Sequence, residues 1–175
     1  MRIAPSVVFA TLLGGIITGP LAAQAGGVEL GADVGLGLSF GGGSTVFTAS
    51  TPTSLRFGVP VGSTMSLEPR VNLVFVSGEG DTFTNLSLTP ALLFGFGGEA
   101  RNGPYAAVLP SLSLASGFGE TTTQFGAGAG VGVRRMSSNQ FGLRFELQFM
   151  HFFENDDIGD YNDLRALIGF SYFTR

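Results

Sequence analysis

Apolar and polar residues alternate along long stretches of this chain. Between Val28 and Phe40 every second residue is apolar, and the residues between them are glycine, serine or acidic. The same two-residue period runs through residues 124–133 and 141–149. Because successive side chains of a β-strand point to opposite faces, this period predicts strands that have one apolar and one polar face.

Eight such segments can be placed between clusters of glycine, serine and asparagine, which are typical of turns. Between the second and third segments, pairing Val61 with Met65 keeps apolar residues on one face and leaves a three-residue turn. Five prolines fall inside the segments, where we expect β-bulges because proline cannot donate to a ladder: Pro52, Pro60, Pro69, Pro90 and Pro110. The predicted strands are residues 28–40, 47–61, 65–75, 85–95, 104–115, 122–133, 141–151 and 162–173.

The composition indicates which face is turned toward the solvent. Only 13% of the residues are charged, against about 25% in soluble domains, and all nine basic residues are arginine. An exterior of glycine and serine without lysine would be unusual in water, so we expect the apolar faces to point outward into lipid. The predicted fold is all-β: an eight-stranded antiparallel up-and-down transmembrane β-barrel. Its interior is just wide enough for side chains, which argues against a general porin.

A soluble, lipocalin-like barrel that holds an apolar ligand is the alternative with the faces reversed. It would place the charged residues outside and the long glycine rows on the water side. The lack of lysine in those rows argues against it.

The first 25 residues have the pattern of a secretory signal peptide. Arg2 precedes an apolar run from Val7 to Ile17, and the small residues Ala23 and Ala25 mark a cleavage site. We therefore expect a signal peptide over residues 1–25 and one barrel domain over residues 26–175. An exported chain of this kind is expected in the outer membrane, and its even number of strands places both termini on the periplasmic side.

Charged residues on the predicted inner faces form the candidate site. They should make a network of ion pairs, because a charge in a narrow interior is costly unless it is paired. We expect Arg56 to meet Glu68, and Arg144, Glu146 and Arg165 to lie together; the basic pair Arg134 and Arg135 is assigned to a turn. Two interpretations are open: a polar cluster that fixes strand register, which we favour, or a gated conduit whose charges exchange partners. The network comprises Glu29, Asp33, Arg56, Glu68, Arg70, Arg144, Glu146, Asp163 and Arg165.

Other kinds of chemistry have little support in the sequence. A net charge of −4 with scattered arginines argues against nucleic-acid binding, and the chain has no cysteine for disulfides or thiolate metal sites. The segment around His151 is loosely similar to that of lipid A deacylase barrels, but Phe153 stands where their serine nucleophile would be. We therefore expect no enzyme activity, cofactor or metal site, and we interpret the acidic run 154–160 as a solvated loop.

The signal peptide, the eight segments and the phrases LEPRVNL, GLRFELQF and IGFSYF together resemble the small OmpA/OmpX-type outer-membrane barrels. This resemblance implies a structural or surface-interaction role, or a narrow channel as the alternative. It also implies outer-membrane lipid, lipopolysaccharide and the assembly machinery as partners of a monomer. The sequence ends at Arg175 without a peptidoglycan-binding domain, so envelope tethering is not expected, and its last residues are Thr174 and Arg175 rather than the usual phenylalanine.

Overall fold

A computed structural model describes residues 27–41, 44–77, 82–96, 102–117, 120–155 and 159–174. The predicted signal peptide lies outside the described residues. The strands are β1 (Glu29–Gly41), β2 (Ser44–Pro60), β3 (Met65–Ser77), β4 (Thr82–Gly95), β5 (Gly103–Gly117), β6 (Glu120–Met136), β7 (Phe141–Phe152) and β8 (Tyr161–Phe173).

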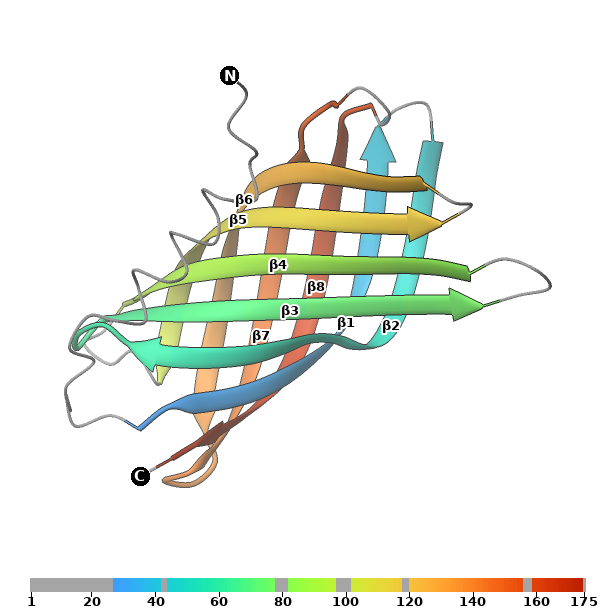
Figure 1. The fold of residues 1–175 in the computed structure, drawn as a ribbon. Coiled ribbons are helices and arrows are strands. Elements are labelled where there is room, and N and C mark those ends of the chain that lie inside the picture. The colour runs from blue at the N-terminus through green and yellow to red at the C-terminus, as the bar shows by residue number, and fades with distance from the viewer. Residues whose placement is uncertain are drawn as a thin grey trace, which may run out of the picture.

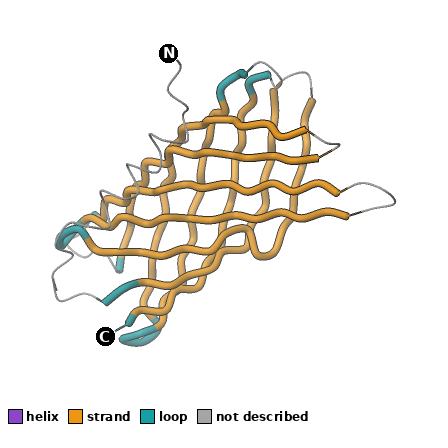
Figure 2. Tube along the Cα trace, in the orientation of Figure 1, coloured by secondary structure: helices purple, strands orange, loops and turns teal. Residues whose placement is uncertain are grey.

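These strands form a closed antiparallel barrel in which each strand pairs with its neighbours in sequence (Figure 1). Strand β8 closes the barrel by pairing with β1, from Glu29 opposite Phe173 to Phe40 opposite Asn162. Figure 2 shows the described residues as strands and short loops. Among these residues there is no helix that is long and apolar enough to span a membrane. The predicted eight-stranded up-and-down barrel is confirmed.

The turn between β2 and β3 has the predicted register. The backbone amide of Val61 donates to the carbonyl oxygen of Met65 at 2.9 Å, and Val59 lies opposite Leu67. The two-residue period of the flanking apolar residues was therefore sufficient to fix this hairpin.

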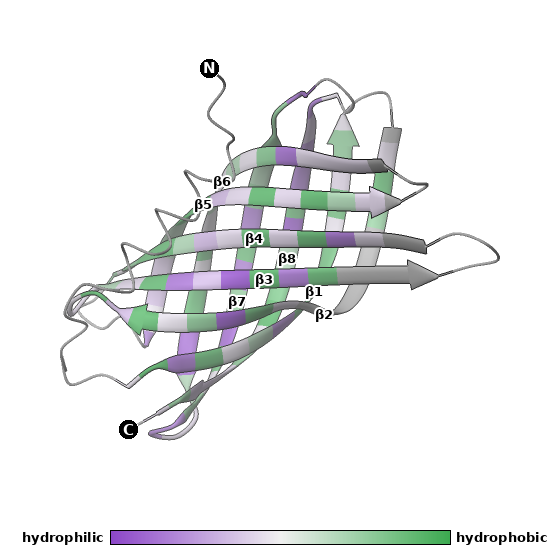
Figure 3. Cartoon of the chain, in the orientation of Figure 1, coloured by the Kyte–Doolittle hydropathy of each residue, from purple (hydrophilic) through white to green (hydrophobic). Residues whose placement is uncertain are grey.

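Side chains alternate between the two faces of the wall along most of the described strand residues. On the outside, Leu73 and Phe170 are 64% and 63% exposed, whereas on the inside Asp33, Glu68 and Arg144 are fully buried. Figure 3 shows the corresponding bands of apolar and polar residues along the strands. The arrangement is the reverse of a soluble barrel, because the apolar side chains form the exterior.

Three prolines lie beside interruptions of the ladders that flank the β3–β4 hairpin. Pro69 is directly opposite Pro90 on the β3–β4 seam, whose pairing is continuous. On the β2–β3 seam, Pro69 falls where pairing stops, between Arg56 opposite Arg70 and Val59 opposite Leu67. On the β4–β5 seam, which includes Pro110, pairing stops between Leu88 opposite Leu112 and Leu92 opposite Val108. Inside the barrel, the hydroxyls of Thr89 and Ser111 are 3.0 Å apart and bridge this interval. The missing proline amides are thus confined to particular seams.

Pro52 lies in a bulge of β2. The β1–β2 register changes between Asp33 opposite Ser54 and Gly35 opposite Ser50, so that residues 51–53 oppose a single residue of β1. The predicted bulge is present at this proline.

The interior also contains an apolar cluster that the sequence patterns did not emphasise. Its members are at most 3% exposed, and Tyr161 packs against them: Ala91, Leu93, Tyr105, Ala107, Leu109, Met150 and Phe152. Strands β4 and β5 therefore supply mostly small, apolar or hydroxyl side chains to the interior, and the charges come from the other strands.

Candidate functional site in the barrel interior

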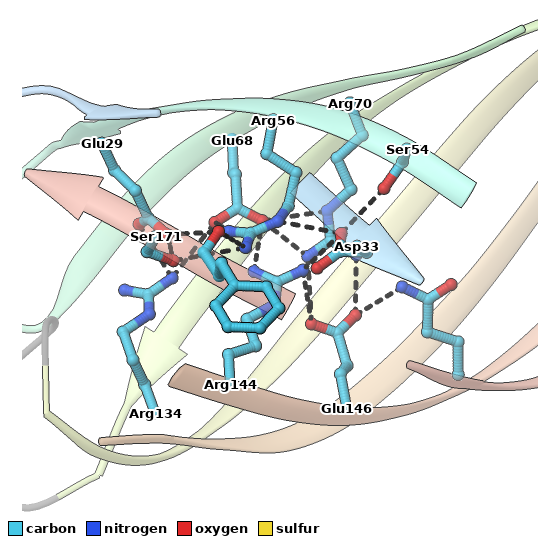
Figure 4. Close-up of polar contacts among 12 residues, drawn as sticks. Glu29, Asp33, Ser54, Arg56, Glu68, Arg70, Arg134, Arg144, Glu146 and Ser171 are labelled. Atoms are coloured by element: carbon cyan, nitrogen blue, oxygen red, sulfur yellow. Dashed lines mark hydrogen bonds and ion pairs between the residues drawn. The ribbon is translucent and has the colours of Figure 1, made fainter. Parts of the chain in front are cut away.

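Among the described residues, eight charged side chains converge inside the barrel (Figure 4). Each lies on the inner face because it is an even number of residues away from the other inward-facing residues of its strand. Four are acidic and four are arginines, so the cluster has no net charge. They are Glu29 and Asp33 of β1, Arg56 of β2, Glu68 and Arg70 of β3, Arg134 of β6, and Arg144 and Glu146 of β7. We call this set the charge cluster.

Glu68 is the centre of the charge cluster. Its carboxylate accepts from Arg144 at 2.6 Å and from Arg70 at 2.9 Å. Arg134 and Arg56 approach it at 3.1 and 3.5 Å. The predicted meeting of Arg56 and Glu68 is present, and one buried carboxylate is shared by four guanidinium groups.

Glu146 forms a second centre. It pairs with Arg70 at 2.7 Å and with Arg144 at 3.0 Å. The hydroxyl of Tyr105 also donates to it, and the Tyr105 ring centroid lies 5.6 and 5.7 Å from the guanidinium carbons of Arg134 and Arg144. Tyr105 therefore ties β5 to the charge cluster through both its hydroxyl and its ring face.

Glu29 and Asp33 complete the charge cluster from β1. Arg56 contacts Glu29 at 2.7 Å and Asp33 at 2.8 Å, and Arg134 reaches Glu29 at 3.0 Å. The hydroxyl of Ser171 in β8 donates to Glu29. With these contacts, every strand except β4 contributes a described side chain to the network.

Inner-facing glycines provide the space that these long side chains occupy. A Cβ atom placed on Gly31 would lie 2.6 Å from the guanidinium carbon of Arg56, and one on Gly132 would lie 2.5 Å from the hydroxyl of Tyr105. The glycine-rich polar faces thus have a steric reason: an alanine on one wall would collide with a side chain from another.

Asp163 and Arg165 lie apart from the charge cluster. Arg165 pairs with Asp163 on its own strand, and its side chain is 31% exposed. Our expectation that Arg165 would lie with Arg144 and Glu146 is wrong. In the β7–β8 register Arg165 is opposite Gln148, while Glu146 is opposite Leu167, so Arg165 lies nearer the end of the barrel that is away from the termini.

The described residues give no support for a metal site. They contain no group of histidine, cysteine or carboxylate side chains that could hold a metal ion. Nδ1 of His151 is 3.1 Å from the amide oxygen of Asn162, and its ring packs edge-on against Phe153 with centroids 5.1 Å apart. Both partners are consistent with a surface position near the barrel rim.

Proteins of known structure share this architecture. No protein-family model and no curated protein matches the sequence. Among solved structures, neisserial surface protein A is similar at a TM-score of 0.64 and 14% identity, over 84% of this chain and 97% of that one. Ail, the attachment invasion locus protein of Yersinia pestis, is similar at 0.52 and 12%, over 83% and 97%. The chain has the fold of small outer-membrane β-barrels.

One arginine of this outer-membrane barrel fold was missed by the sequence interpretation. The sequence places Arg134 in a predicted turn, but β6 continues to Met136 and Arg134 is 1% exposed inside the barrel. The alternation itself contains the signal, because Gly130 and Gly132 face inward and Arg134 is the next residue in that series. With Arg134 included, the inner face of the part of the barrel whose side chains are described carries five arginines for five acids, counting the Asp163–Arg165 pair.

The adjacent arginines of β6 give a matched test of the face assignment. We expect Arg134→Ala to lower the free energy of unfolding by about 3 to 5 kcal/mol, because Glu29 and Glu68 lose a buried partner. Arg135→Ala, on the exposed outer face, should change it by no more than about 0.5 kcal/mol. Urea titration of both variants in the same detergent measures the difference. If Arg135→Ala were the more harmful change, the inward assignment of Arg134 would be wrong.

Proposed function

We propose that the protein is an integral outer-membrane β-barrel whose interior is closed by the charge cluster, and that its role is structural or in surface interaction. The observation that carries this proposal is the set of ion pairs that link β1, β2, β3, β6 and β7 across the interior. Such an interior supports a rigid membrane scaffold better than a path for solutes.

Membrane insertion is supported by the exterior. Outward residues on all eight strands are predominantly apolar, and the exposed ones include Leu36, Phe57, Val108, Phe145 and Phe170. A closed barrel satisfies its backbone hydrogen bonds between strands, which is what a hydrocarbon environment requires. Both termini would then lie on the periplasmic side, as in single-chain barrels with an even number of strands.

Closure of the interior is supported by the energetics of the cluster. Opening a path past Glu68 or Glu146 requires separating guanidinium groups from buried carboxylates, and breaking one buried pair costs about 3 to 5 kcal/mol. Among the described residues, Glu68 has four arginine partners and Glu146 has two, so the exchange of a single partner does not open the interior.

The proposed partners follow from the position of the barrel in the envelope. Outer-membrane lipid and lipopolysaccharide would contact its apolar wall and its far rim, and the outer-membrane assembly machinery would insert it as a monomer. No cofactor, nucleic acid or enzymatic reaction enters this proposal.

A narrow channel is the second candidate, and one cavity favours it. A small cavity of about 30 Å³ lies inside the barrel, bordered by hydroxyls of β4 and β5 and by Arg70 and Arg165 on one part, and by Met150, Phe152 and Leu167 on another. One water needs about 10 to 15 Å³ of such space, so the cavity has room for about two waters. The cavity borders Arg70, but passage beyond it would require rearrangement of the charge cluster.

Reconstitution in liposomes and planar bilayers tests the proposal. We expect the refolded protein to float with liposomes, to be released only by detergent, and to give no reproducible conductance steps. Steps that change in Arg144→Ala or Glu146→Ala would support the channel instead. Recovery as a lipid-free soluble monomer would support the lipocalin-like alternative.

A further inference from the structure

The outer wall carries an apolar groove that the charge cluster does not explain. It has a volume of about 930 Å³ and crosses four adjacent strands, β6, β7, β8 and β1, at the same level. Its exposed walls are Leu36, Val131, Phe145, Leu147 and Ile168. The groove is open to the surroundings along its outer side, so it offers a shallow apolar surface and not an enclosed pocket.

The groove arises from a small residue within a row of large ones. Ala166 of β8 lies between Leu36 of β1 and Leu147 of β7 in the paired registers. Because its methyl group is much shorter than its neighbours, the outer surface is hollowed along β8. The next row toward the termini, Val34, Ile168 and Phe145, also lines the groove.

One charged residue stands beside this groove. Within the eight described strands, the outward-facing series contains a single charge, Arg135, which is exposed. Arg135 follows Val133 of the groove on the same face of β6, about 7 Å along the strand. It lies at the end of the barrel that holds the termini, since the amide of Phe173 donates to Gln140 in the turn that follows β6.

We infer that this groove binds the acyl chains of one anionic glycerophospholipid, whose headgroup phosphate is held by Arg135. The occupant is fixed by charge complementarity: a lipid-facing arginine selects a phosphate headgroup, and the apolar groove that begins two residues away accepts the chains. The inference rests on the proposed membrane location. Because Arg135 is at the termini end, the bound lipid belongs to the periplasmic leaflet.

Tryptophan fluorescence gives a direct test, because the chain contains no tryptophan. Phe145→Trp places a reporter in the groove, and Phe57→Trp places a matched one on β2, outside the groove, where the native phenylalanine is 46% exposed against 49% for Phe145. Each variant is reconstituted in phosphatidylcholine vesicles that contain the same small fraction of chain-brominated phosphatidylglycerol or chain-brominated phosphatidylcholine.

We expect brominated phosphatidylglycerol to be preferred at the Phe145→Trp reporter by roughly fivefold in apparent affinity, the size expected for one arginine at an anionic lipid. The two brominated lipids should quench the Phe57→Trp reporter equally. Adding Arg135→Gln should remove the preference, whereas Arg135→Lys, which keeps the charge, should retain most of it.

Three results would overturn the inference: equal quenching by both lipids at the groove, a preference that survives Arg135→Gln, or a groove reporter that neither lipid reaches while the β2 reporter is quenched. The last result would indicate that a second copy of the chain covers the groove. If neither reporter is quenched, the membrane location itself fails, so the two proposals are separable.

Discussion

Glu68→Ala is expected to lower the free energy of unfolding of the refolded barrel by about 3 to 5 kcal/mol, the usual effect of breaking a buried ion pair. The variant leaves four arginines without their shared carboxylate. Two of them, Arg56 and Arg70, lie directly opposite each other on the β2–β3 seam, and like charges in that position repel. Urea titration in detergent, with unfolding monitored as the loss of β-structure, measures this change in the free energy of unfolding.

Two further glutamate variants complete this test. Glu68→Gln keeps the size of the side chain and should lose most of the same stability, because the shared charge is what it removes. Glu154→Ala, at an exposed loop position, should shift the free energy by no more than about 0.5 kcal/mol. Equal urea midpoints for all three proteins would contradict the assignment of inner and outer faces.

Gly169→Ala should destabilise the barrel by about 1 to 3 kcal/mol, the cost of overpacking a filled interior. A Cβ atom on Gly169 would collide with Oδ1 of Asp33 and would lie 2.8 Å from Nη2 of Arg56. Replacing glycine by alanine in a strand otherwise gains about 0.5 to 1 kcal/mol from reduced backbone freedom. The collision is expected to exceed this gain, because it displaces two side chains that are themselves ion-paired.

Gly159→Ala is the matched control, since a Cβ atom there would have no neighbour within 4 Å. Its urea midpoint should equal or slightly exceed that of the parent protein. A Gly169→Ala barrel as stable as the Gly159→Ala barrel would mean that the interior is less tightly filled than the contacts indicate.

The strand count, the β2–β3 turn and the inward assignment of most charges followed from the sequence. They depend only on a two-residue period, which is local and survives any change of tilt or shear. The same period extends through Arg134, but the predicted strand ends at Val133 and leaves Arg134 in the turn, whereas β6 continues to Met136.

The partners within the charge cluster could not be deduced in the same way. Whether Arg165 or Arg70 reaches Glu146 depends on how far each strand is staggered around the closed barrel, and periodicity carries no information about that stagger. The role of Tyr105 was hidden for a related reason: its hydroxyl meets Glu146 across the interior, from a strand that otherwise contributes small and apolar residues.

Because of the interrupted ladders, fewer backbone pairs hold the β3–β4 hairpin to its neighbouring strands than join the other strands of the barrel. Its two edges are the seams with β2 and β5, and these have the fewest paired residues of the eight seams that the structure describes, with β2 paired to β3 at four positions. Few backbone pairs therefore connect the two edges of this hairpin to the rest of the barrel wall. From this hairpin, Glu68 and Arg70 extend across the interior and form ion pairs with residues of β2, β6 and β7. These ion pairs therefore fix the position of the hairpin across the interior, where backbone pairing along its edges is sparse.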